Sequence, residues 1–226
     1  MMRLTLIVAA CALAACSSKP VPPAWKANAY GSLNSFSNAY LRGDTSIAET
    51  EFRRARGEVA STGRPDLVAR AELVRCAAQV ASLDFGPCEG YAALAQDAAL
   101  EERAYASFIG GQWQGLNVAL LPEQHRPVVA SGTAVGVEDP LARLVAAGAL
   151  MRAQRITPAD IAAAVETASE QGWRRPLLAW LGVQLKRAQA AGDAATAAQI
   201  QRRIDLAGTT PAPVNPVDEA PPGIAK

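Results

Sequence analysis

Apolar residues recur three and four positions apart along most of residues 26–207, and no segment there alternates apolar with polar residues for long enough to form a convincing strand. After Pro65, for example, apolar residues stand at Leu67, Ala71, Val74, Ala78 and Ala81. This spacing places side chains on one face of a helix. Only 5% of the residues are aromatic, so these faces consist mainly of small side chains, which suit closely packed helices. The sequence therefore predicts an all-α protein.

Helix start and stop signals divide this region into helices with short connections. Gly43 and Asp44 separate two helices predicted over 28–42 and 46–61, because Gly favours the end of a helix and Asp favours its N-terminal cap. Thr157, Pro158 and Asp160 together are close to a capping box. The other helices are predicted from Pro65 to Leu83, over 88–108 either unbroken or broken near Asp97, and from Pro140, Pro176 and Asp193 onward. Connections this short make neighbouring helices antiparallel hairpins.

One segment resembles a known repeat. Gly43, Ala48, Phe52 and Ala55 have the spacing of the second-helix half of a tetratricopeptide repeat. In that family the small Ala residues let two helices approach, and the Phe fills the groove between them. The Trp-containing first half of the repeat motif is absent from the preceding helix. The resemblance implies a tetratricopeptide-like α-solenoid or an irregular array of helical hairpins, and a compact helical bundle is the alternative.

The N-terminal residues resemble an export signal. A short apolar stretch follows Arg3 and ends in Leu-Ala-Ala-Cys at 13–16, which is similar to the lipobox of bacterial lipoprotein precursors. The resemblance implies that residues 1–15 are a signal peptide and that Cys16 becomes the acylated first residue, so that lipid anchors the chain to a membrane. Ser17 follows where an Asp would retain many Gram-negative lipoproteins in the inner membrane. The resemblance therefore favours the outer membrane, with the folded domain in the periplasm.

Proline and glycine divide the rest of the chain. Residues 16–25 contain three Pro and are expected to form the lipidated Cys and a flexible tether. Residues 26–207 form the helical domain, in which Gly and Pro interrupt the helical pattern over 110–138; such a stretch is either functional or a linker between two helical halves. Residues 208–226 contain five Pro among 19 residues and have little to bury, which predicts a disordered tail.

The sequence contains four Cys. Once Cys11 leaves with the signal peptide and Cys16 carries lipid, Cys76 and Cys88 remain, and a pair of Cys in an oxidising compartment indicates a disulfide. Cys76 lies within the helix predicted to run to Leu83. The bond therefore requires this helix to end early or the following loop to fold back, since the Cα atoms must approach within about 7 Å. Two buried thiols are the alternative.

Sequence motifs for catalysis, phosphate binding or dinucleotide binding are missing, and we expect no enzymatic activity and no cofactor. His125 is the only His, which excludes a multi-His metal site. Its neighbours Gln124 and Arg126 supply no carboxylate that could orient it as a general base. The chain has 22 Lys and Arg against 21 Asp and Glu, so it lacks the strong positive charge with which nucleic-acid-binding proteins contact phosphates.

Arg174 and Arg175 are the candidate partner-binding residues. They stand just before Pro176 at a predicted hairpin turn, where side chains are normally exposed. Arginine is also enriched among the residues that dominate binding energy at protein interfaces. We therefore expect this turn to contact a protein partner.

These features predict a lipid-anchored periplasmic helical-repeat protein that acts as a protein-binding scaffold or adaptor. Stacked helical hairpins form extended concave surfaces that suit segments of a partner. The alternative is a cell-envelope enzyme that acts on cell-wall material through an active site without a sequence motif. A bare groove favours the scaffold, whereas a deep pocket lined by converging acids with shifted pKa values favours the enzyme.

Overall fold

The computed structural model describes residues 23–209, which form helices and turns without any strand. The α-helices are α1 (Ala24–Arg42), α2 (Thr45–Ala60), α3 (Pro65–Ala81), α4 (Glu89–Ala92), α5 (Leu100–Ile109), α6 (Arg126–Ser131), α7 (Pro140–Arg152), α8 (Pro158–Glu170), α9 (Arg174–Ala190) and α10 (Ala194–Gly208). Two short 3-10 helices, η2 (Val118–Leu120) and η3 (Glu123–His125), precede α6. The predicted all-α fold class is confirmed. The predicted signal peptide, Cys16, most of the predicted tether and nearly all of the predicted tail lie outside the described residues.

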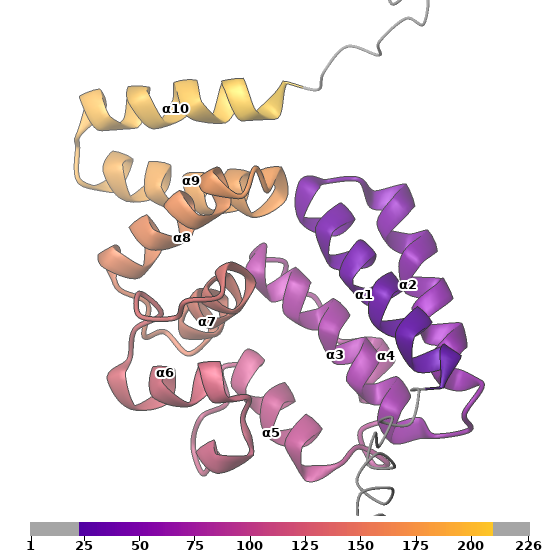
Figure 1. Ribbon diagram of the computed structural model, residues 1–226. Coiled ribbons are helices and arrows are strands. Elements are labelled where there is room, and N and C mark those ends of the chain that lie inside the picture. Colours follow the sequence, from indigo (N-terminus) through magenta and orange to yellow (C-terminus); the bar gives the residue numbers. More distant parts are fainter. Residues whose placement is uncertain (1–22, 210–226) are drawn as a thin grey trace, which may run out of the picture.

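Helices α1 and α2 form the predicted antiparallel hairpin (Figure 1). Gly43 ends α1 with a φ of 98°, a conformation that favours glycine, and its N–H group donates to the carbonyl of Ala39 at 3.1 Å. Ala48 and Phe52 of α2 are buried, and the Phe52 ring lies 5.2 Å from the ring of Phe36 in α1. The residues that resemble the repeat motif therefore hold this hairpin together.

Helix α3 lies at the centre of the molecule, where it contacts α1, α2, α5 and α7 (Figure 1). It lies close to α7 at Gly148, where an added Cβ atom would collide with the Val80 carbonyl group. Trp180 of α9 is fully buried beside the end of α3, and its indole N–H donates to the carbonyl of Ala81 at 3.0 Å. The central helix thus joins the two halves of the chain.

The C-terminal helices α7 to α10 lie one above another, each in contact with the next (Figure 1). The predicted capping box is present at α8, where Asp160 and Thr157 exchange backbone-to-side-chain hydrogen bonds of 3.2 and 3.1 Å. Helix α9 begins at Arg174, two residues before the predicted start at Pro176. Pro176 still falls in the first turn, where backbone N–H groups have no acceptor within the helix, so its missing N–H group has little cost.

Contacts between distant helices make this fold an irregular helical array. In a simple solenoid each repeat contacts only its neighbours. Here α3 contacts α7, and α9 contacts α1 at the other end of the chain. The N-terminal hairpin and the C-terminal stack therefore pack against each other as well as against the elements that follow them in sequence.

The irregular segment at 110–138 contains η2, η3 and α6. Val128 and Val129 lie within α6. The buried carboxylate of Asp160 ties this segment to α8, because it accepts hydrogen bonds from the Thr133 hydroxyl at 2.6 Å and the Ala134 N–H at 2.8 Å. Burial opposes ionisation of Asp160, but these bonds and those from Thr157 leave its pKa below the usual value.

A candidate binding cleft beside the disulfide

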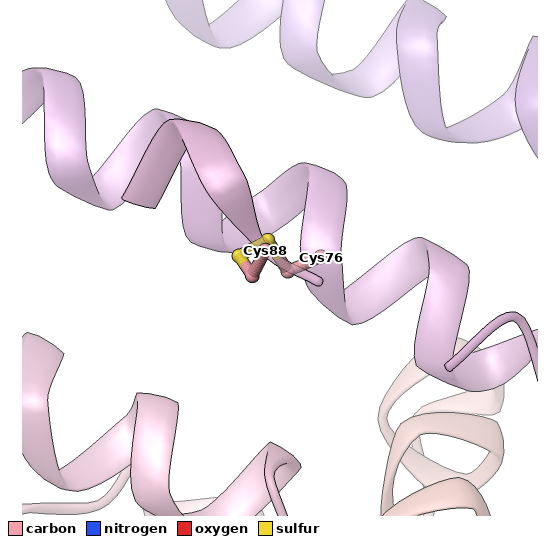
Figure 2. The surroundings of a disulfide bond; sticks show 2 residues. All are labelled: Cys76 and Cys88. Atoms are coloured by element: carbon pink, nitrogen blue, oxygen red, sulfur yellow. A yellow bond between two sulfur atoms is a disulfide. The ribbon is translucent and has the colours of Figure 1, made fainter. Parts of the chain in front are cut away.

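Cys76 and Cys88 lie at disulfide-bonding distance, with Cα atoms 5.8 Å apart (Figure 2). Cys76 lies within α3, and Cys88 immediately precedes α4. The pairing is possible because α3 ends at Ala81 and the chain then turns back at Leu83, which has a φ of 57°. The sequence identified the pair, and the structure supplies both the early helix end and the folded-back loop that the bond requires.

A cleft of about 680 Å³ opens beside this disulfide. Its lining comes from α3, the returning loop, α4, α5 and the end of α7. The polar side chains in the lining are Gln79, Asp84, Tyr91, Arg103, Ser107, Gln112 and Arg152. Many of the lining residues are exposed, including Asp84, Ala92, Arg103 and Arg152, so the cleft is an open surface groove. Its volume is typical of sites that bind ligands.

One wall of the cleft is the returning loop at 84–88. The disulfide attaches the end of this loop to α3. The Arg152 guanidinium lies 5.3 Å from the centre of the Phe85 ring, and the Gly86 N–H donates to the Asp84 carboxylate at 3.3 Å. The position of this wall therefore depends on one covalent bond and a few weak contacts.

Two arginines from different helices give the cleft a positive character. Arg103 of α5 donates hydrogen bonds to two backbone carbonyls, those of Gln96 at 2.8 Å and Ala98 at 2.9 Å. Arg152 of α7 donates to the carbonyl of Gly110 at 3.2 Å. Among the described residues, no carboxylate forms a salt bridge with either arginine. Both guanidinium groups therefore remain available to an anionic ligand.

The other titratable groups in the cleft do not neutralise this charge. Asp84 is the one acidic residue in its lining, and its carboxylate also accepts a hydrogen bond of 3.4 Å from the Tyr40 hydroxyl outside the cleft. Burial raises the pKa of Tyr91, with nearby Arg103 opposing this shift, so the phenol is uncharged at neutral pH. The lining therefore carries two positive charges and one negative charge.

A smaller cleft of about 400 Å³ also borders the disulfide. Cys76 and Cys88 line both clefts. Two of the arginines of the smaller cleft are already paired, Arg56 with Glu72 at 2.7 Å and Arg75 with Glu49 at 2.7 Å. The larger cleft is therefore the better candidate for binding an anion.

His125 lies in the core, with only 2% of its surface exposed. Its ring centre is 4.9 Å from that of Phe108 and 5.7 Å from that of Tyr105, and its Nδ1 atom has no hydrogen-bond partner among the described residues. Burial lowers the pKa of His125 to about 4, against a smaller opposing effect of Asp139. The side chain is therefore neutral at neutral pH, and it packs against aromatic rings instead of lining the larger cleft.

Arg175 braces the molecule internally, which corrects the reason for expecting a partner contact there. Its guanidinium donates to the carbonyl of Tyr40 at 2.7 Å and to the hydroxyl of Thr45 at 2.8 Å, and it lies 4.2 Å from the centre of the Tyr40 ring. Arg174 lies against Gly43, which is in the turn between α1 and α2. Both arginines are half-buried, so they are less exposed than expected for residues at a turn. Tertiary packing of α9 against the α1–α2 hairpin uses both side chains.

The arginines of the cleft were missed by sequence reasoning because no local pattern marks them. Arg103 and Arg152 are far apart in the sequence and lie on helices that meet only in the folded protein. The Cys pair was the one available signal, since it identified the loop that forms one wall. Tyr91 follows Cys88 by a few residues, so its place near that loop could have been inferred from the Cys pair alone.

Metal sites and membrane-spanning helices are missing from residues 23–209. No group of three or more His, Cys, Asp or Glu residues in this range could hold a metal ion. None of the helices in the same range has both the length and the apolar character needed to cross a membrane. The chain matches no protein-family model, no curated protein and no solved structure.

Proposed function

We propose that this chain is a lipid-anchored scaffold of the bacterial cell envelope that binds a partner protein in the cleft beside the disulfide. The observation that carries this proposal is the cleft itself, an open groove of about 680 Å³ that combines apolar walls with hydrogen-bonding side chains. An open groove admits a segment that continues beyond it at both ends, as a stretch of a larger protein does. Arg103 and Arg152, which pair with no carboxylate of the described part of the chain, supply directional contacts.

The proposed location rests on the lipobox-like sequence that ends at Cys16. Cys16→Ser removes the sulfur atom that would accept the lipid, so we expect the variant to leave the membrane fraction and to lose metabolic fatty-acid label. Stable attachment requires more than one acyl chain, because a single chain binds membranes only marginally. Undiminished label on the Cys16→Ser variant would contradict the proposed anchor without bearing on the cleft.

Partner binding is tested by filling the cleft. Ala92 is exposed and lines the cleft, whereas its neighbour Ala93 is equally exposed but lies outside it. Ala92→Trp places an indole in the groove, and Ala93→Trp adds the same group beside it. We expect the wild type and Ala93→Trp to capture the same proteins from detergent-solubilised membranes, as read by mass spectrometry, and Ala92→Trp to lose them.

Two results would count against this proposal. Equal capture by Ala92→Trp and the wild type would show that the cleft is not the binding surface. Turnover of isolated cell-wall material by the purified chain would favour an enzyme instead. Circular dichroism and thermal unfolding of both Trp variants serve as folding controls, because neither substitution replaces a buried side chain.

A further inference from the structure

We propose that the cleft selects an acidic segment of polypeptide, which would place a carboxylate between Arg103 and Arg152. This inference rests on the proposed function, because it names the chemistry of the segment that the cleft would bind. The two arginines come from α5 and α7, and both line the same cleft. An Asp or Glu side chain that enters the groove therefore meets guanidinium donors that come from two separate helices.

The state of each guanidinium supports an anionic occupant. Arg103 uses its Nε and Nη2 atoms for the backbone carbonyls of Ala98 and Gln96, which orients the group and leaves Nη1 without a partner among the described residues. Arg152 uses Nε for the carbonyl of Gly110 and stacks on Phe85, so within residues 23–209 both of its terminal nitrogens lack a hydrogen-bond partner. Each group is thus positioned in advance while keeping N–H donors for a ligand, so a bound carboxylate needs little reordering of either side chain.

Other arginines on the same half of the molecule form ion pairs, which Arg103 does not within the described residues. Arg56, Arg70 and Arg75 each form a salt bridge with a Glu, at distances of 2.6 or 2.7 Å. Residues 44–105 contain eleven acidic and seven basic residues, so carboxylates are in excess around α2, α3 and α5. In this acidic half, Arg103 forms no ion pair within the described residues. The structure leaves the positive charge of the cleft for a group that comes from outside.

The rest of the lining favours a polypeptide as the carrier of the carboxylate. Gln79 and Gln112 are in the lining, and side-chain amides can both donate to and accept from a peptide backbone. The same lining contains apolar surface from Leu73, Val80, Tyr91 and Ile109. These suit an apolar side chain next to the acidic one. The predicted ligand is therefore a short stretch that combines Asp or Glu with a large apolar residue.

The test is a selection from random dodecapeptides displayed on phage, with the full-length chain immobilised in detergent. Parallel selections use the wild type, Ala92→Trp and Ala93→Trp. We expect peptides recovered by the wild type and Ala93→Trp, but not by Ala92→Trp, to be several-fold enriched in Asp and Glu over the unselected library. Cleft-dependent peptides that are neutral or basic would overturn the inference while leaving the proposed binding function in place.

Charge variants then test the two arginines with one selected acidic peptide as the probe. We expect Arg103→Gln and Arg152→Gln each to weaken its binding about tenfold, as loss of a charge-assisted hydrogen bond does. Arg54→Gln, on the exposed face of α2 and outside the cleft, should leave binding unchanged. Equal affinity of all three variants for the probe would overturn the inference.

The two proposals fail in distinguishable ways. If Ala92→Trp abolishes partner capture but no cleft-dependent peptide is recovered, the cleft binds its partner through something other than a linear acidic segment, and only this inference falls. If Ala92→Trp has no effect on partner capture, the proposed binding function falls as well. Thermal unfolding of the Arg103→Gln and Arg152→Gln variants shows whether a loss of affinity comes from the site or from loss of fold.

Discussion

Gly148→Ala tests whether α3 and α7 pack as closely as the structure shows. A Cβ atom at position 148 would overlap the carbonyl oxygen of Val80 and lie 2.7 Å from its Cγ1 atom and 2.9 Å from its carbonyl carbon. The oxygen belongs to the backbone of α3 and also accepts a hydrogen bond of 3.0 Å from the Leu83 N–H, so it cannot rotate away. The extra methyl group must push the two helices apart.

Two opposing effects set the size of the change. Replacing Gly with Ala inside a helix stabilises it by about 1 kcal/mol, because Ala has the higher helix propensity. Forcing an additional carbon into a packed core costs about 1–3 kcal/mol, and contact with rigid backbone places Gly148 at the upper end of that range. We therefore expect the free energy of unfolding to fall by about 2 kcal/mol.

Gly182→Ala is the matched control. Gly182 lies within α9, and a Cβ atom there would have no neighbour within 4 Å, so only the helix-propensity effect remains and we expect a gain of about 0.5–1 kcal/mol. Urea denaturation followed by far-ultraviolet circular dichroism measures both changes, provided that the m-values match. A Gly148→Ala variant as stable as the wild type would refute the close approach of α3 and α7.

Three further predictions follow from the same structure. The pKa of His125 falls from 6.5 to about 4 on folding, so the unfolded chain binds a proton more tightly than the folded chain does. The contribution of neutral His125 to the free energy of unfolding is therefore complete above pH 6.5. It should decline between pH 6.5 and pH 4 by about 1.4 kcal/mol per pH unit. Urea denaturation at several pH values should show that His125→Leu flattens this dependence, and an unchanged slope would contradict it. Cys88→Ser should lower the free energy of unfolding by about 2–3 kcal/mol. Dithiothreitol should lower the stability of the wild type to the same level, and a wild type whose stability does not respond to dithiothreitol would refute the disulfide. Arg175→Gln removes the contacts of α9 with α1 and α2 and should lower the free energy of unfolding by about 1–2 kcal/mol. Arg187→Gln changes an exposed site on the same helix and should lower it by less than about 0.5 kcal/mol. Similar losses for both variants would exclude a specific brace at Arg175.

The helices could be predicted because their signals are local. Apolar spacing and caps such as Gly43 and the Thr157–Asp160 box act within a few residues, and both are present as expected. The Cys76–Cys88 pair could also be identified, because the expected loss of Cys11 and the expected acylation of Cys16 left one pairing of the four Cys. The turn at Leu83 that brings this loop back could not be predicted, since it uses a positive φ at a residue that rarely adopts one.

The arrangement of the helices depends on contacts between residues that no sequence window contains. Trp180 donates to Ala81 across 99 positions, and Arg175 donates to Tyr40 across 135. Such contacts turned an expected exposed basic turn into an internal brace, and they brought Arg103 and Arg152 into one cleft. Periodicity and caps act over one helical turn and so specify each helix. Which helices meet depends on burying their apolar faces and satisfying polar groups together, and those requirements are met only when the whole chain has folded.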